Sequence, residues 1–118
     1  MSYYAKRERT INGFKVTTIF EEFEEQIGEI CIDFETTSAD GTPVSNTDQT
    51  AGFSVKDIRA IFKGIKVMMT VANNKGHTTF SFTATNDKRY SVYKRFIKVV
   101  GGEITEDDGE HVTFEAIV

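Results

Sequence analysis

The sequence predicts an α+β fold in which two helices pack on one face of a mainly antiparallel sheet. Three observations support this class. Several short runs alternate apolar with polar residues, two longer segments carry an apolar stripe at helical spacing, and turns rich in Asn or Gly join neighbouring runs. The predicted order of elements is ββ-loop-α-ββ-α-ββ.

The first pair of strands is predicted over residues 14–23 and 29–37. Both runs are rich in β-branched and aromatic residues and alternate with a period close to two. In the second run, Cys31 and Asp33 face away from the apolar residues. The short link between the runs predicts a hairpin. A helix over 19–27 is the alternative, because the apolar residues there also fit a helical stripe.

A loop and a capped helix follow this hairpin. Residues 38–53 contain the only proline and mostly turn-forming residues, which predicts a long loop. Ser54 caps the helix, Asp57 forms an incomplete capping box with it, and Gly64 ends the helix. The buried stripe of this helix comprises Val55, Ile58, Ile61 and Phe62. Before the first strand, residues 1–12 are predicted to form a flexible basic arm.

The second half of the chain repeats the alternation of strands and helix. Strands are predicted over 65–72 and 77–85, joined by the turn NNKG. Asn86 or Asp87 then caps a helix over 88–99. The stripe of this helix consists of Arg89, Tyr93, Phe96, Ile97 and Val100. Two strands around the turn EDDGE close the chain as a final hairpin.

Length and composition limit the class of protein. A chain of 118 residues predicts one domain spanning 1–118. No apolar run approaches the roughly 20 residues that cross a bilayer, and the start of the chain has no apolar segment typical of a secretory signal. A single cysteine excludes an internal disulfide and fits a reducing compartment. We therefore expect a cytoplasmic protein that does not associate with a membrane.

The residues that usually perform catalysis or bind metals are few and scattered. His77, His111 and Cys31 have no metal-ligand spacing. Cys31 lies between two isoleucines, and the acidic residues near it would raise the pKa of its thiol. No glycine-rich loop opens a helix to hold a phosphate. We expect no catalytic residue, no metal and no cofactor.

The charges are segregated along the chain, whose net charge is −4. Acidic residues gather between Glu21 and Glu35, whereas basic residues gather in the N-terminal arm and in helix 88–99. Both clusters are candidate surfaces for binding a partner, and a solvated face is the alternative interpretation. The candidate partner-binding residues are Glu21, Glu22, Glu24, Glu25, Lys88, Arg89, Lys94, Arg95 and Lys98.

The segment KGHTTFSF, residues 75–82, resembles the aromatic motif on the third strand of RNA-recognition-motif domains. The predicted order of elements also resembles the ferredoxin-like layout of those domains. His77 and Thr79 occupy the positions where that motif stacks bases on aromatic rings. The resemblance therefore implies a fold and no RNA-binding surface.

The segment FSFTATNDKRYSVYKRFIKVVGGEI resembles the closing strand–helix–strand of the GNAT acetyltransferase fold. The resemblance implies that Tyr93 is the aromatic residue of the helix, and that Gly101 or Gly102 leads into the last hairpin. The sequence lacks the Arg/Gln-x-x-Gly-x-Gly/Ala loop that holds the pyrophosphate of acetyl-CoA in that fold.

The chain also resembles small bacteriophage-encoded proteins, which are short, acidic and rich in aromatic residues. We expect a non-catalytic binding protein that engages another macromolecule: a phage or mobile-element factor, for host takeover or anti-defence, that inhibits or modulates a host protein. The alternatives are a nucleic-acid-binding module that uses helix 88–98, which the net negative charge disfavours, and a degenerate acetyltransferase-like enzyme. Exposed strand edges also allow a homodimer.

Overall fold

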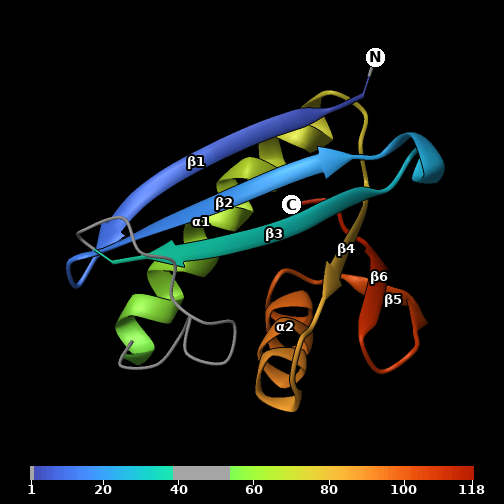
Figure 1. Cartoon of the computed structure of the whole chain (residues 1–118). Helices are drawn as coiled ribbons and strands as arrows, with labels where there is room; N and C mark the ends of the chain where they lie inside the picture. The colour runs from blue at the N-terminus through green and yellow to red at the C-terminus, as the bar shows by residue number, and fades with distance from the viewer. Residues whose placement is uncertain (1, 39–53) are drawn as a thin grey trace.

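The computed structural model describes residues 2–38 and 54–118 (Figure 1). The chain has an α+β fold, as predicted, with one six-stranded mixed sheet and two α-helices. The elements are β1 (Tyr4–Ile11), β2 (Phe14–Glu22), the short 3₁₀ helix η1 (Glu24–Gln26), β3 (Ile30–Thr37), α1 (Val55–Asn74), β4 (Thr79–Thr83), α2 (Asp87–Val99), β5 (Glu103–Asp107) and β6 (His111–Glu115).

The strands lie in the order β1-β2-β3-β4-β6-β5, and every neighbouring pair is antiparallel except β3 and β4. The parallel pair is short, since Ile30–Ile32 of β3 pairs with Phe80–Phe82 of β4. Figure 1 shows β4 turning away from β3 beyond this contact. The sheet therefore opens between its two central strands.

Both helices pack on one face of the sheet, where alternate residues of β2, β3, β4 and β6 are buried. Phe82 lies at the centre of this core, with its ring next to the rings of Tyr93, Phe96 and Phe114. The ring of Phe62 in α1 lies 4.8 Å from that of Phe96 in α2, so the two helices also contact each other. The opposite face of the sheet bears neither helix and is called the open face below.

The predicted strand over 65–72 is wrong, because these residues continue α1. The buried residues Ile65, Met68, Met69 and Ala72 recur at helical spacing and pack into the core. The β-branched residues between them face outward and misled the prediction. Gly64 lies inside the helix instead of ending it. The ferredoxin-like layout is also wrong, since it needs two strands between the helices and the structure has one.

The prediction of a flexible N-terminal arm over residues 1–12 is also wrong. Residues Tyr4–Ile11 form β1, which pairs with β2 through a tight turn at Asn12 and Gly13. Both of these residues have a positive φ, which the sequence signal NG favours. The predicted loop over 38–53 lies, apart from Ser38, outside the described residues.

Two further local predictions are wrong: Val55, placed in the buried stripe of α1, is 69% exposed, and NNKG ends α1 instead of joining two strands. The hairpins and the helix caps are confirmed. β2 and β3 form the predicted hairpin, and β5 and β6 form the closing one. The Ser54 hydroxyl accepts from the Asp57 N–H, and the Asp57 carboxylate accepts from the Ser54 N–H, which completes the capping box of α1. The side chain of Asn86 accepts from the Arg89 N–H and caps α2.

Candidate functional site

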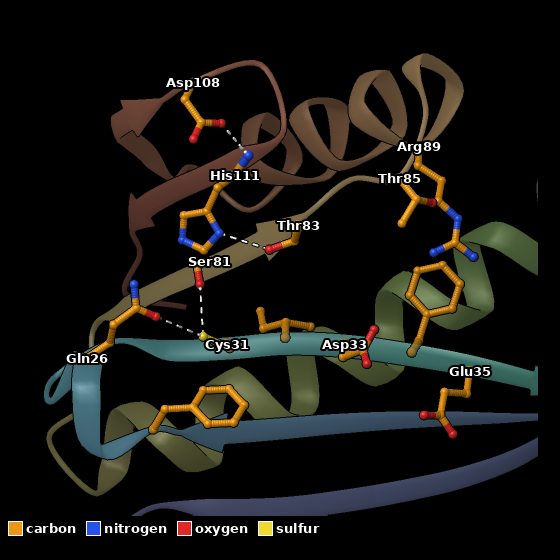
Figure 2. Close-up of a pocket in the computed structure, with 13 residues that line it drawn as sticks. Gln26, Cys31, Asp33, Glu35, Ser81, Thr83, Thr85, Arg89, Asp108 and His111 are labelled. Carbon is orange, nitrogen blue, oxygen red and sulfur yellow. Dashed lines mark hydrogen bonds between the residues drawn. The ribbon is translucent and has the colours of Figure 1, made fainter. Parts of the chain in front are cut away.

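A cleft of about 750 Å³ opens on the open face, where β3 and β4 diverge (Figure 2). It extends from the turn after β2, across the outward side chains of β3 and β4, to the start of α2. Its lining residues are Phe23, Gln26, Cys31, Ile32, Asp33, Phe34, Glu35, Ser81, Thr83, Thr85, Arg89, Asp108 and His111.

The floor of the cleft is a hydrogen-bonded network centred on the carboxylate of Glu29, which lies just before β3. Ser81 Oγ donates to Glu29 Oε2 at 3.0 Å, and Thr113 Oγ1 donates to Glu29 Oε1 at 3.2 Å. His111 lies between Glu29 and Thr83, with Nε2 3.2 Å from Glu29 Oε2 and Nδ1 2.9 Å from Thr83 Oγ1. Because these groups bond one another, the network holds β3, β4 and β6 together beneath the cleft.

Cys31 lies at the edge of this network and is half-buried. Its thiol is 3.4 Å from Ser81 Oγ and 3.8 Å from Glu29 Oε2. Burial, together with the negative charges of Glu29 and Glu21, raises the pKa of the Cys31 thiol. The expectation that acidic neighbours raise this pKa is confirmed, and the arrangement does not activate Cys31 as a nucleophile.

The end of the cleft next to α2 is closed by Arg89, which is 6% exposed. Its guanidinium carbon lies 4.7 Å from the centre of the Phe34 ring, and its Nη1 donates to the Tyr93 hydroxyl at 3.3 Å. Burial raises the pKa of Tyr93 to about 12, although Arg89 opposes this shift. Arg89 therefore serves the fold at this position, and Tyr93 remains protonated at neutral pH.

The mouth of the cleft is acidic. Asp33 and Glu35 are exposed and alternate with the buried residues of β3. Asp108 lies across the cleft on the turn between β5 and β6. Phe23, which is 43% exposed, contributes an aromatic ring at the end nearest the turn after β2. A ligand at this mouth would meet carboxylates around an apolar anchor.

The structure divides the predicted acidic cluster. Glu21 lies on the open face opposite Cys31, while Glu24 and Glu25 are exposed on η1. Glu22 points to the other face and is buried. It accepts hydrogen bonds from the N–H groups of Tyr3 at 3.1 Å and Gly28 at 2.7 Å, and these bonds lower the pKa of Glu22. Glu22 thus ties the N-terminus to the turn instead of facing a partner.

The predicted basic cluster is divided in the same way. Lys88, Arg95 and Lys98 are exposed, and they lie on the outside of the helix layer. Arg89 points inward, as described above. Lys94 forms an ion pair with Asp107 of β5, with Nζ 3.3 Å from Oδ2, and it also donates to the Tyr90 hydroxyl.

Of the residues that line the cleft, the sequence singles out Arg89 as a candidate for binding and includes Glu35 in the acidic cluster, but it does not predict that they share a cleft. The alternation in β3 places Asp33 on the polar side of the strand, but the pairing of β3 with β4 is what brings Ser81 beside Cys31 and Thr83 into the same cleft. Nothing local in the sequence joins Glu29 to His111, which are 82 residues apart. Their meeting depends on the order of strands in the sheet.

Among the described residues, no helix is long and apolar enough to cross a membrane. Within the same ranges, no three His, Cys, Asp or Glu side chains are placed to hold a metal ion. Comparisons of the chain with protein-family models, with curated proteins and with solved structures found no match.

Proposed function

We propose that the protein is a non-catalytic binding protein whose open sheet face engages a basic segment of another protein. The observation that carries this proposal is the cleft between β3 and β4, whose mouth combines the exposed carboxylates of Asp33 and Glu35 with the exposed ring of Phe23. Aromatic anchors surrounded by polar residues are typical of protein interfaces.

The chemistry of the floor favours binding over catalysis. The Glu29 carboxylate already accepts from Ser81 and Thr113 and lies against His111. Because these groups hydrogen-bond one another, none of them is placed as a general base beside a free nucleophile. Cys31, the remaining candidate, has a raised thiol pKa.

The sign of the charge favours a basic protein segment as the ligand. Asp33, Glu35 and Asp108 surround the mouth, and Glu21, Glu24 and Glu25 extend the negative surface toward η1. Nucleic acid would be repelled from this face. A lysine or arginine side chain entering the cleft would gain Coulomb energy that falls as salt is added.

The test uses a fluorescein-labelled peptide of alternating lysine and serine, with fluorescence anisotropy as the readout. We expect the double substitution Asp33→Asn with Glu35→Gln to weaken binding about tenfold, because it removes both charges at the mouth. The matched control is Glu103→Gln with Glu106→Gln, which removes two exposed charges from β5, outside the cleft. The control should weaken binding by about threefold at most, through long-range attraction alone.

Equal losses in the two double variants would show that the open face is only a solvated acidic surface, and the proposal would then fail. If the cleft variant alone loses binding, the wild-type protein and this variant become paired baits for affinity capture from a host lysate. Mass spectrometry of proteins retained by the wild type alone then identifies the partner.

Several expectations remain predictions. A bacteriophage origin, a host protein as partner, a cytoplasmic location and a homodimer through exposed strand edges are proposed from the sequence alone. The acetyltransferase-like alternative is supported by the order β4, α2, β5. It is opposed by Tyr93, which is buried beside Arg89 and does not line the cleft. A thermal shift with acetyl-CoA tests it, since a ligand at 100 times its Kd adds about 2.7 kcal/mol to stability.

A further inference from the structure

The two helices form a second concave surface, which is apolar and basic where the cleft is acidic. A groove of about 500 Å³ runs between α1 and α2. Its lining residues are Val55, Ile58, Arg59, Phe62, Lys63, Lys66, Arg95, Phe96, Val99 and Val100. Every charged residue in this set is basic.

The rim of the groove is basic because the two helices hold most of the positive charge. Nine of the 14 basic residues and two of the 18 acidic residues lie in α1 and α2. On α1, Arg59, Lys63 and Lys66 follow one another at spacings of four and three, which places them along one side of the helix. The two acidic residues, Asp57 and Asp87, lie in the first turns of their helices.

The floor and edges of the groove are apolar. The ring contact between Phe62 and Phe96 forms part of the floor. At the edges, Val55 is 69% exposed and Val99 is 71% exposed, one on each helix. Large apolar side chains that line a concave surface with a charged rim mark a site for a partner.

We propose that this groove binds an acidic amphipathic helix of a partner protein. An amphipathic helix lays an apolar stripe into such a groove, and acidic residues beside the stripe would meet Arg59, Lys63, Lys66 and Arg95 on the two rims. The groove side of α1 from Val55 to Lys66 rises about 17 Å, enough for about three turns of a bound helix.

The apolar lining argues against a nucleic acid at this site. Phosphates would be attracted by the rims, but the exposed Val55 and Val99 offer them no hydrogen bond. The two rings on the floor, Phe62 and the buried Phe96, pack against each other and not against a ligand base. Concavity likewise argues against a membrane surface, because an interfacial helix buries an apolar face that projects from the protein.

The experiment uses a fluorescein-labelled helical peptide with leucine at i, i+3, i+4 and i+7, glutamate on its flanks and alanine elsewhere. One control peptide has the same composition in scrambled order, and a second has lysine in place of glutamate. By fluorescence anisotropy, we expect each control to bind about tenfold more weakly than the amphipathic acidic peptide, because each lacks one half of the match.

The protein variant that tests the groove is Val55→Glu with Val99→Glu. Both positions are exposed, so the fold should persist, and circular dichroism with a thermal melt checks this. The matched control is Val67→Glu with Val71→Glu. These valines are also exposed on α1 but line a different hollow beside β1. We expect the groove variant to weaken peptide binding about tenfold and the control variant about threefold at most.

The inference is independent of the proposed function. Asp33→Asn with Glu35→Gln should leave binding of the acidic peptide unchanged, while it weakens binding of the lysine–serine peptide.

Equal binding of the scrambled peptide, or equal losses in the two valine variants, would contradict the proposal that the groove binds an acidic helix. The proposal would also fail if an oligonucleotide or anionic lipid vesicles bound more tightly than the peptide and the groove variant abolished that binding. Either result would assign the surface to another class of partner.

Discussion

The guanidinium of Arg89 lies over the ring of Phe34, with its central carbon 4.7 Å from the ring centre. Arg89 belongs to α2 and Phe34 to β3, so this contact spans the gap that opens between β3 and β4. The same guanidinium donates to the Tyr93 hydroxyl, and the ring of Phe34 lies edge-on to that of Tyr93. Arg89 and Phe34 therefore line the inner end of the cleft, and Tyr93 packs behind them in the buried core.

Substitution of Arg89 should destabilise the protein. Arg89→Met keeps an unbranched stem but removes the buried cation–π contact and the hydrogen bond to Tyr93, so we expect the free energy of unfolding to fall by about 2 kcal/mol. Urea denaturation followed by circular dichroism measures the change. Arg95→Met, on the exposed side of the same helix, should change stability by about 0.5 kcal/mol at most. An equal effect at the two positions would contradict the structural role of Arg89.

Glu22 should make stability depend on pH in the acidic range. Hydrogen bonds from Gly28 and Tyr3 lower the pKa of Glu22 in the folded protein, so its contribution is complete above its unfolded pKa, roughly 4.3. That contribution is lost as pH falls through the lower folded value. The difference in unfolding free energy between the wild type and Glu22→Gln should thus be largest near neutral pH and shrink in acid. Urea denaturation at several pH values measures it.

The control for this pH dependence is Glu24→Gln. Glu24 is exposed on η1, two residues from Glu22. Because the side chain is exposed, its substitution should change the unfolding free energy by about 0.5 kcal/mol at most. If the Glu22→Gln difference stayed constant from neutral to acidic pH, the two backbone hydrogen bonds would not depend on the charge of Glu22.

Local signals in the sequence predicted those parts of the fold that depend on neighbours along the chain. The caps at Ser54 and Asn86 and the hairpin of β2 with β3 follow from residue types at fixed short spacings. The error at 65–72 arose because Ile65 and Val67 favour strands locally, whereas burial of Met69 and Ala72 against the core favours a helix.

The cleft could not be predicted, because it depends on the parallel pairing of β3 with β4 across a crossover. Arg89 illustrates the limit for single residues. The sequence placed it both in the apolar stripe of the second helix and among the basic residues of a binding surface. Its burial against Phe34 assigns it to the stripe, and only the tertiary contact decides between the two.

Cys31 should react slowly with iodoacetamide in the folded protein. Burial, followed by the charge of Glu29, raises the pKa of the thiol above its ordinary value of 9.0, and only the thiolate reacts. The alkylation rate, followed by mass spectrometry, should keep rising beyond pH 9, and Glu29→Gln should increase the rate at pH 8. The same thiol in the urea-unfolded chain is the reference. A faster reaction in the folded protein than in the unfolded chain would indicate an activated thiolate and would reopen a catalytic role.

Two glycines should respond in opposite directions to the same substitution. A Cβ on Gly102 would lie 2.9 Å from Ile97 Cγ2 and 3.0 Å from Phe114 Cδ2. Gly102→Ala therefore overpacks the contact of α2 with β6 and should lower the unfolding free energy by about 1–3 kcal/mol.

Gly64 lies inside α1, and a Cβ added to it would meet no atom nearer than the Arg7 side chain at 3.8 Å. Gly64→Ala should therefore stabilise the protein by about 0.5–1 kcal/mol, because alanine has the higher helix propensity. Urea denaturation of both variants measures the two changes. Destabilisation by Gly64→Ala would mean that α1 is interrupted at Gly64, and would restore a helix end there.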